Sequence, residues 1–354
     1  MHSKTLRTAL ATVTAGLAAA TCLTAAGPAA ASPAAAPAAS GVAARNACSS
    51  SVAIEGFSDA HDKTTYEGTY VGNFSALATD RHGTIAALSD RSFLFRLDED
   101  TLRPKSVVAL ADESGAALDS EGLVVDKDGT YLVSSETEPS VRRYSRTGEI
   151  LDTLPVPDAL RATPAGRGQS NGTFEALTLL PDGRTLVASM EYALSGDDTS
   201  LVRVQTWQRK KGGGFRLGAQ YAYQVDAGLG VPEVTATPDG RLLVLERGFT
   251  SGVGNTVRLY LADARRATDV SGTETLTAGQ RGLRTVKKTL LTDIAACPSL
   301  GATAKQPQPN PLLDNIEGMA VTGRTKGRLD VLLVSDDNQN ATQTTRFYRF
   351  RVRV

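Results

Sequence analysis

The chain has 354 residues and a formal net charge of zero, because 38 basic side chains balance 38 acidic ones. This balance argues against nucleic acid as the main partner, since binding to phosphates requires a basic surplus. Hydrophobic residues make up 41% of the chain, an ordinary share for a globular protein with a large core.

The first 31 residues have the composition of a secretory signal peptide. Lys4 and Arg7 make a basic start, residues 9–23 are apolar, and residues 29–31 are three alanines that suit a cleavage site. The apolar run is too short and too rich in alanine for a good membrane span, so no stable membrane insertion is expected. We therefore expect a secreted, extracellular protein, with a disordered Pro/Ala-rich lead-in over 32–47 and a folded domain over 48–354.

Two cysteines remain after the predicted cleavage, Cys48 and Cys297. An even cysteine count in an exported chain predicts one disulfide. This bond would hold the N-terminus beside the last part of the chain. The alternative is two free buried thiols.

Five stretches of the chain share one layout. Each has a short apolar strand, then a turn, then a second apolar strand that ends at an acidic residue. Their leading positions are 75, 121, 175, 233 and 317, which leaves gaps of 46, 54, 58 and 84 residues. Asp-Gly pairs at 128–129, 182–183 and 239–240 separate the two strands and favour hairpin turns. Periods of about 40 to 50 residues with four strands each are typical of β-propeller blades.

The remainder of each period supplies candidate third and fourth strands. The last copy has one further strand before the chain ends, at 347–352, so a strand near 52–54 is expected to complete that blade and close the ring. The sequence thus predicts an all-β propeller of five blades, with a sixth, degenerate blade in the 84-residue gap left open. The other outer strands are expected at 141–144, 150–154, 201–207, 221–225, 257–261 and 286–291.

Four segments of these repeats resemble one known family. They are Asp119-Ser120-Glu121-Gly122-Leu123, Phe174-Glu175-Ala176-Leu177, Asp314-Asn315-Ile316-Glu317-Gly318-Met319-Ala320 and Val334-Ser335-Asp336-Asp337-Asn338. Together they resemble the secreted phytase-like family, whose members are described by an "esterase-like activity of phytase". The resemblance extends from about residue 52 to the C-terminus and implies a propeller with hydrolase-type activity.

The repeats place acidic residues at two recurrent positions. In a propeller the first strand of each blade is innermost, so the glutamates that begin these strands are expected to converge near the axis and supply the catalytic groups: Glu121, Glu175, Glu233 and Glu317. The second strands return to the same face, and their ends supply candidate metal ligands: Asp90, Glu136, Glu191, Glu246, Asp336, Asp337 and Asn338. Oxygen donors of this kind suit calcium, which is the expected cofactor. The alternative is that each glutamate accepts backbone hydrogen bonds and has a structural role only.

The arginines, one serine motif and the histidines limit which reaction types the site could catalyse. Arg91 and Arg247 follow acidic strand ends, where they could hold a substrate phosphate or carboxylate, or pair within the ring. Ser170 lies in a G-x-S-x-G pattern, but the strand–turn–helix context is lacking and no histidine follows His82. His61 and His82 are the only histidines after the signal, so a histidine-based triad or zinc site is set aside.

These observations predict a monomeric, calcium-dependent hydrolase of small phosphate esters or esters, in which a ring carboxylate activates water. One alternative is a non-catalytic extracellular propeller that binds a ligand or partner and holds calcium structurally. Another is a lactonase-like propeller with the same metal ring. Basic side chains at the acidic mouth would favour phosphate, an apolar mouth would favour esters or lactones, and a flat face would favour binding alone.

Overall fold

The computed structural model describes residues 46–354, so the predicted signal peptide and nearly all of the predicted lead-in lie outside the described residues. Within this range the chain forms strands β1 to β22 and two 3-10 helices, Asp158–Leu160 and Ile294–Ala296. The all-β prediction is confirmed. None of the described residues form a helix of the length and apolarity needed to cross a membrane.

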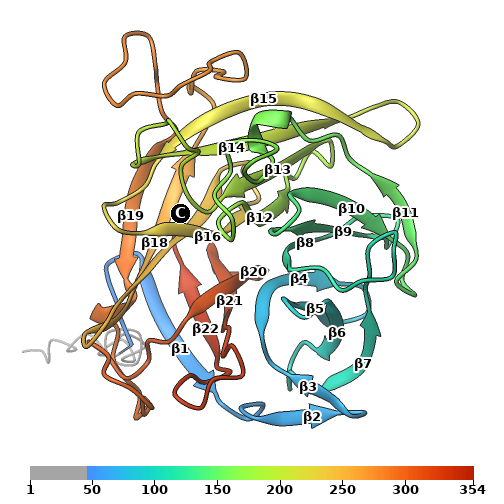
Figure 1. Ribbon diagram of the computed structural model, residues 1–354. Coiled ribbons are helices and arrows are strands. Elements are labelled where there is room, and N and C mark those ends of the chain that lie inside the picture. The colour runs from blue at the N-terminus through green and yellow to red at the C-terminus, as the bar shows by residue number, and fades with distance from the viewer. Residues whose placement is uncertain (1–45) are drawn as a thin grey trace, which may run out of the picture. The chain divides into compact units, whose positions relative to one another are not determined.

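Five four-stranded antiparallel sheets surround a central axis as propeller blades (Figure 1). The first two blades are β4 (Phe74–Asp80), β5 (Thr84–Ser89), β6 (Phe93–Asp98) and β7 (Pro104–Ala109), then β8 (Ser120–Val125), β9 (Tyr131–Ser135), β10 (Ser140–Tyr144) and β11 (Ile150–Thr153). The third and fourth are β12 (Phe174–Leu179), β13 (Thr185–Met190), β14 (Leu201–Arg209) and β15 (Phe215–Gln224), then β16 (Gly230–Ala236), β17 (Leu242–Thr250), β18 (Gly254–Asp263) and β19 (Lys287–Asp293).

The fifth blade is built from both ends of the described chain. Strands β20 (Ile316–Thr325), β21 (Arg328–Ser335) and β22 (Phe347–Val352) are completed by β1 (Val52–Ser58). Val52 pairs with Val352 and Ile54 with Phe350, and Figure 1 shows the blue β1 beside the red β22. The predicted ring closure by the N-terminal strand is therefore confirmed.

The long gap before the fifth repeat does not contain a sixth blade. The described residues of this stretch instead form the long β17–β18 hairpin, strand β19 and the irregular segments 264–286 and 297–315. Sequence analysis also missed β6 and β7 in the first blade. It missed as well the small hairpin of β2 (Thr64–Tyr66) and β3 (Thr69–Val71), whose three-residue strands are too short to show an alternating pattern.

In the second, third and fourth blades the turns between the first two strands lie at the predicted Asp-Gly pairs. Gly129, Gly183 and Gly240 have φ values of 89°, 64° and 81°, which a side chain rarely allows. In the first blade His82 and Gly83 take the same place, with φ values of 60° and 64°. These turns fix which strand residues face each other across the four hairpins.

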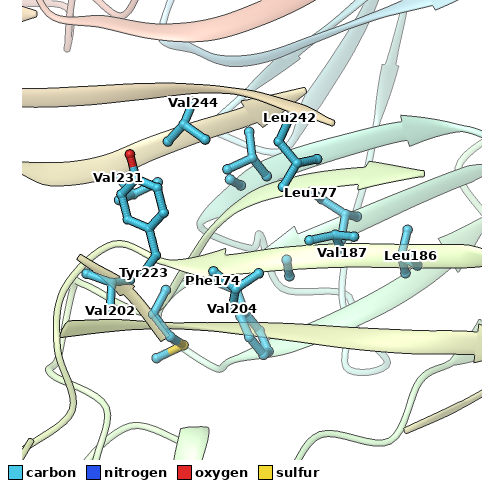
Figure 2. Close-up of a cluster of buried hydrophobic side chains, with 14 of the residues drawn as sticks. Phe174, Leu177, Leu186, Val187, Val202, Val204, Tyr223, Val231, Leu242 and Val244 are labelled. Atoms are coloured by element: carbon cyan, nitrogen blue, oxygen red, sulfur yellow. The ribbon is translucent and has the colours of Figure 1, made fainter. Parts of the chain in front are cut away.

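Blades pack on each other through apolar side chains. Trp207 and Phe174 are fully buried and meet edge to face in the third blade, with ring centroids 5.8 Å apart. Figure 2 shows the neighbouring region, where side chains of the third and fourth blades face each other across the space between their sheets. Burial of this apolar surface is the main driving force that holds the ring together.

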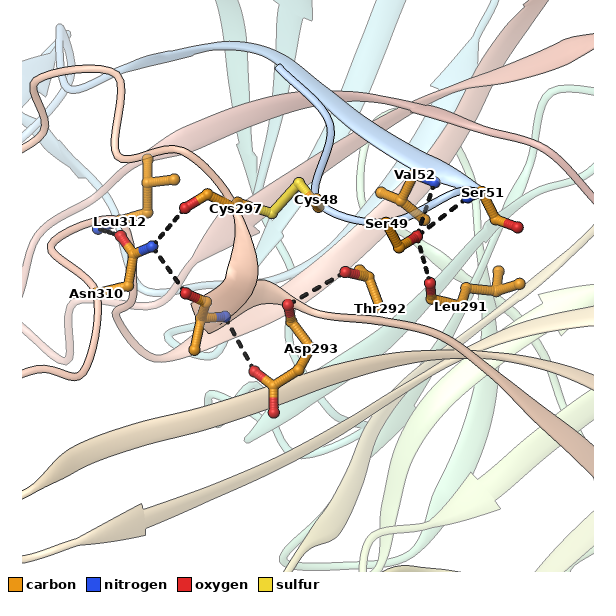
Figure 3. Close-up of a disulfide and its surroundings, with 11 residues drawn as sticks. Cys48, Ser49, Ser51, Val52, Leu291, Thr292, Asp293, Cys297, Asn310 and Leu312 are labelled. Atoms are coloured by element: carbon orange, nitrogen blue, oxygen red, sulfur yellow. Dashed lines mark hydrogen bonds between the residues drawn. A yellow bond between two sulfur atoms is a disulfide. The ribbon is translucent and has the colours of Figure 1, made fainter. Parts of the chain in front are cut away.

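The predicted disulfide between Cys48 and Cys297 is present (Figure 3). It connects the residues just before β1 to the segment between the fourth and fifth blades. Adjacent hydrogen bonds reinforce this connection: the Ser49 hydroxyl donates to the Leu291 carbonyl at 2.6 Å, and the Asn310 amide donates to the Cys297 carbonyl at 2.7 Å. The N-terminal strand is thus held at the point where the ring closes.

Removing the disulfide should destabilise the closed ring. The bond spans 249 residues, and a cross-link over so long a loop contributes on the order of 5 kcal/mol through the unfolded chain. We expect the double substitution Cys48→Ala and Cys297→Ala to lower the thermal midpoint by several degrees in calorimetry, with the native sheet content unchanged by circular dichroism. An unchanged midpoint would show that β1 is held by sheet pairing alone.

Candidate functional site

A β-bulge lies near the start of the first strand in all five blades. In the third blade Phe174 pairs with Met190 and Ala176 with Ser189, so Glu175 is left without a partner across the strand. A bulge bends the strand and changes the direction of the extra side chain. The residues at this position in the first, second, third and fifth blades are Ser75, Glu121, Glu175 and Glu317.

A repeated backbone hydrogen bond places a second acid beside each bulge. The residue just after the second strand donates its N–H to the carbonyl of the residue two positions before the bulge, at 2.7 to 2.9 Å. The donor and acceptor pairs are Asp90 with Asn73, Glu136 with Asp119, Glu191 with Thr173, and Asp336 with Asn315. Each of these blades thus presents its strand-end acid and its bulge residue side by side.

Small residues after the bulge bring the blades close together at the axis. A Cβ on Gly122 would lie 2.5 Å from the Cβ of Leu177, and one on Gly318 would lie 3.2 Å from the Cα of Ala76. A glycine inside a strand often marks such a close approach of another chain segment. In the Glu-Gly pairs at 121–122 and 317–318, the glutamate therefore supplies an acidic side chain, and the glycine allows the neighbouring inner strand to pack closely.

These features converge on one cavity of about 270 Å³ at the axis. Its lining contains eight carboxylates and a single guanidinium, and Tyr192 is its only aromatic residue. The carboxylates are Asp90, Asp119, Glu121, Glu136, Glu175, Glu191, Glu317 and Asp336, and the guanidinium is Arg247. Ser75, Asn171, Asn315 and Asn338 add polar groups.

One half of the cavity has the donor arrangement of a cation site. Asp119, Glu121 and Glu136 each offer an oxygen within 4.8 Å of the others, and so do Glu136, Glu175 and Glu191. Glu136 belongs to both groups. One of its buried oxygens, Oε1, has no hydrogen-bond partner among the described residues. A donor set made only of oxygens fits a hard divalent cation such as calcium.

The other half of the cavity is organised by Arg247. Its guanidinium lies 3.0 Å from Glu191 Oε1 and 3.1 Å from Glu317 Oε1, and it donates to the Asn315 side-chain carbonyl. The amide of Asn315 in turn donates to Glu317 Oε1 at 2.9 Å and to Asp336 Oδ2 at 3.4 Å. Arg247 therefore links carboxylates of the third and fifth blades.

Burial in this crowded site raises the carboxyl pKa values. Burial first, and then the neighbouring carboxylates, raise the pKa of Glu136 to about 7. The pKa of Glu317 rises to about 8 for the same reasons, although the charge of Arg247 opposes the rise. Burial and adjacent acids also raise the pKa values of Glu121, Glu175 and Asp336 well above the ordinary range. The fully ionised cavity is thus unfavourable without a cation.

The fourth blade does not contribute the two acids that the repeats predict. Gly230 pairs with Arg247 as Phe174 pairs with Met190, so the counterpart of Glu175 is Val231, two residues before Glu233. The carboxylate of Glu233 lies outside the cavity and accepts the N–H of Val234 at 2.7 Å.

Glu246 precedes the equivalent strand end and faces away from the axis. It accepts the Tyr223 hydroxyl at 2.7 Å and pairs with Lys288 at 2.5 Å. The repeat in the fourth blade is therefore displaced along its strands relative to the others, and the expectation that Glu233 and Glu246 join the ring is corrected.

Two other predicted residues also lie apart from the cavity lining. Asp337 pairs with Lys63 and accepts the Tyr70 hydroxyl and the Asn73 N–H, so its oxygens are already engaged. The side chain of Arg91 is 61% exposed, and its Nε lies 3.6 Å from Asp90. Arg91 is therefore an ion-pair partner of an acid in the cavity and does not line the cavity itself.

Sequence reasoning missed three residues of the lining. Asp119 lies two residues before Glu121, as Asn315 lies two before Glu317, and this shared spacing could have identified it. Asn171 has a positive φ of 56° and belongs to the G-x-S-x-G segment, which brings part of that loop to the cavity. Tyr192 directly follows Glu191, and only the folded chain shows that its ring reaches the same space.

The chain matches known proteins by sequence as well. A family model described as "Phytase-like: Esterase-like activity of phytase" matches residues 69–339, a range that includes the whole cavity lining. An "Uncharacterized secreted protein" of Arthroderma benhamiae is 34% identical over 107 residues, which cover 23% of this chain and 21% of that protein. The matched segment thus spans about a fifth of that relative.

Solved structures with a similar backbone have little sequence in common with the chain. A Myxococcus xanthus glutaminyl cyclase is 14% identical, with 86% of this chain and 97% of that one covered and a TM-score of 0.42. A Xanthomonas campestris gluconolactonase is 13% identical (80% and 73% covered, TM-score 0.40). A Staphylococcus aureus virginiamycin B lyase is 10% identical (79% and 66% covered, TM-score 0.37). At these values the similarities carry no argument about activity.

The raised pKa values predict how calcium-free protein responds to pH. Glu136 and Glu317 have folded pKa values of about 7 and about 8, above their unfolded value of 4.5, so the folded state binds more protons than the unfolded state in this range. Stability should therefore fall as pH rises from about 6.5 to about 8, where the proton excess of the folded state ends. His61, whose pKa burial lowers from 6.5, acts in the opposite sense only below this window. Thermal midpoints in chelator provide the measurement, and a constant or rising midpoint would contradict the raised pKa values.

Proposed function

The chain belongs to the phytase-like family, and from this premise we propose that it is a calcium-dependent hydrolase of small phosphate esters. The observation that carries the proposal is the cavity of eight carboxylates and one guanidinium. Like charges at such density require protons or a cation. A secreted relative and a disulfide are consistent with an extracellular protein, and we propose that the chain acts outside the cell.

The residues proposed to hold calcium are those of the two overlapping acidic groups: Asp119, Glu121, Glu136, Glu175 and Glu191. Carboxylate oxygens are the ligands that calcium takes in proteins, and the unpartnered Oε1 of Glu136 is available to it. When bound, calcium supplies charge neutralisation and polarisation of a phosphoryl or carbonyl oxygen.

Arg247 is proposed to orient the substrate anion. Its guanidinium lies between Glu191 and Glu317 at the cavity wall, and its buried Nε has no hydrogen-bond partner among the described residues. Arginine recognises phosphate through several parallel donors. The unpartnered N–H is therefore proposed to bind a substrate oxygen next to Glu191, one of the proposed cation ligands.

Glu317 is proposed as the general base. The Asn315 amide and Arg247 both hold its Oε1, which leaves Oε2 to accept a proton from an attacking water. A base works best when its pKa lies near the operating pH, and burial raises the pKa of Glu317 to about 8. The water oxygen then bonds to phosphorus as the bond to the alcohol oxygen breaks, and the alcohol leaves with the proton that Glu317 has taken from the water.

The cavity lining favours a charged substrate over a lactone or an apolar ester. Apart from the ring of Tyr192, the lining side chains are acids, amides, one serine and one arginine. Such a wall offers little apolar contact to an acyl chain or lactone ring. Carboxylic ester hydrolysis remains the second candidate because the family description names an esterase-like activity.

Replacing the proposed base should remove activity. We expect Glu317→Gln to lower the rate of phosphate release from phytate and from an aryl phosphate by about a hundredfold or more, in line with the loss of a general base. The measurement is phosphate release by the mature chain in calcium and in chelator, with an aryl acetate assayed in parallel.

The matched control is Glu233→Gln. Glu233 is buried more deeply than Glu317, but its carboxylate lies outside the cavity, and glutamine resembles the neutral form that its raised pKa favours. This variant should retain wild-type activity. No phosphate release by the wild-type chain in calcium, or equal losses in both variants, would contradict the proposed phosphatase mechanism, and release of acetate alone would move the assignment to an esterase.

A further inference from the structure

We propose that the space between the third and fourth blades is a binding site for an uncharged apolar small molecule larger than benzene. The site is separate from the acidic cavity and does not depend on the proposed hydrolase activity.

The proposed site is a cavity of about 260 Å³ between two sheets. Strands β13, β14 and β15 form one wall, and β16 and β17 form the facing wall, with Val286 and the segment after β18 at one side. Figure 2 shows part of both walls, with Val187, Val204 and Tyr223 on the third blade and Val231, Leu242 and Val244 on the fourth.

Most of the side chains that line this cavity are small. Six valines, two alanines and a glycine face it, but no phenylalanine, isoleucine or methionine does. The interface between the first and fifth blades is different, because Phe74 meets Phe95 and Phe347 there with ring centroids 5.6 and 5.8 Å apart. Large side chains fill that interface, and an equivalent volume is left unfilled here.

Three of the hydroxyl groups that line the cavity already donate hydrogen bonds within the protein. The Tyr223 hydroxyl donates to Glu246 at 2.7 Å, the Thr206 hydroxyl donates to the Ala219 carbonyl at 2.8 Å, and the Thr185 hydroxyl donates to Asp182 at 2.9 Å. A buried water needs two to four polar partners. The walls therefore suit an apolar occupant better than water.

The volume sets the size of this occupant. An apolar cavity of about 150 Å³ in another protein stays dry and takes up benzene. The larger cavity here can hold two fused aromatic rings or a short branched acyl chain. No charged side chain in the walls is available to bind a charged group, because Arg265 at the rim is paired with Asp263.

The opening of the cavity faces away from the carboxylates. Its more exposed residues are Gln208, Gly240, Ala264 and Arg265, which lie near the turns that join the first two strands of each blade. Glu191 and Arg247 lie at the other ends of these strands. An apolar molecule can thus enter without meeting the acidic site.

The test uses naphthalene as the probe and fills the cavity by mutation. We expect naphthalene to raise the thermal midpoint of the wild-type chain in a saturable way and to shift the methyl NMR signals of Val187, Val204 and Leu242. Ala219→Phe adds a ring at a wall position and should weaken naphthalene binding at least about tenfold without lowering the midpoint of the free protein. Leu151→Phe, on an exposed residue of the second blade, is the control and should bind as the wild type does.

If the Ala219→Phe variant does not fold, the methyl NMR shifts that naphthalene causes in the wild-type chain still test the proposal. Shifts confined to the lining residues support the site. Absence of binding by the wild-type chain, shifts located elsewhere, or equal binding by a folded Ala219→Phe variant would each overturn the proposal.

Discussion

The mutual repulsion of eight carboxylates in one buried cavity is the constraint on which the rest of this structure depends. Backbone geometry positions seven of these acids: a β-bulge directs three of them, and the other four donate their backbone N–H groups across the strand pair at 2.7 to 2.9 Å. A rigid closed ring can keep such groups together because the apolar contacts between blades outweigh their repulsion. The disulfide at Cys48 and the pairing of β1 with β22 keep that ring closed.

The fourth blade departs from the repeat, and this departure places a positive charge on one side of the acidic cavity. Four blades offer an acid after their second strand, whereas the fourth offers Arg247 to the cavity. Val231, the counterpart of the bulge residue Glu175, lines the apolar space between the third and fourth blades. The same displacement thus supplies the single positive charge of the acidic cavity and part of the wall of the second one. An evenly repeated ring would have neither feature.

Much of the fold can be predicted from the sequence because hairpin signals are local. Asp-Gly turns between apolar runs identify the inner strands, and the missing last strand requires β1 to close the ring. The site was only partly predictable. Glu233 and Glu175 begin similar sequences, yet Glu175 is itself the bulge residue, whereas the bulge of the fourth blade lies at Val231, two residues before Glu233. The composition and spacing of the repeats do not reveal this offset. No repeat position predicts that Tyr192 lines the cavity, and only the folded structure places it there.

The central claim is that the acids of the second and third blades form a cation site, and anomalous X-ray diffraction from crystals grown with calcium tests it most directly. The account predicts a calcium peak bounded by Glu121, Glu136 and Glu175, with Asp119 and Glu191 beside it. Replacement of calcium by terbium should give a stronger peak at the same position. A cavity without a peak in saturating calcium, with the carboxylates in the same arrangement, would contradict the account and leave the ring a protonated, structural feature.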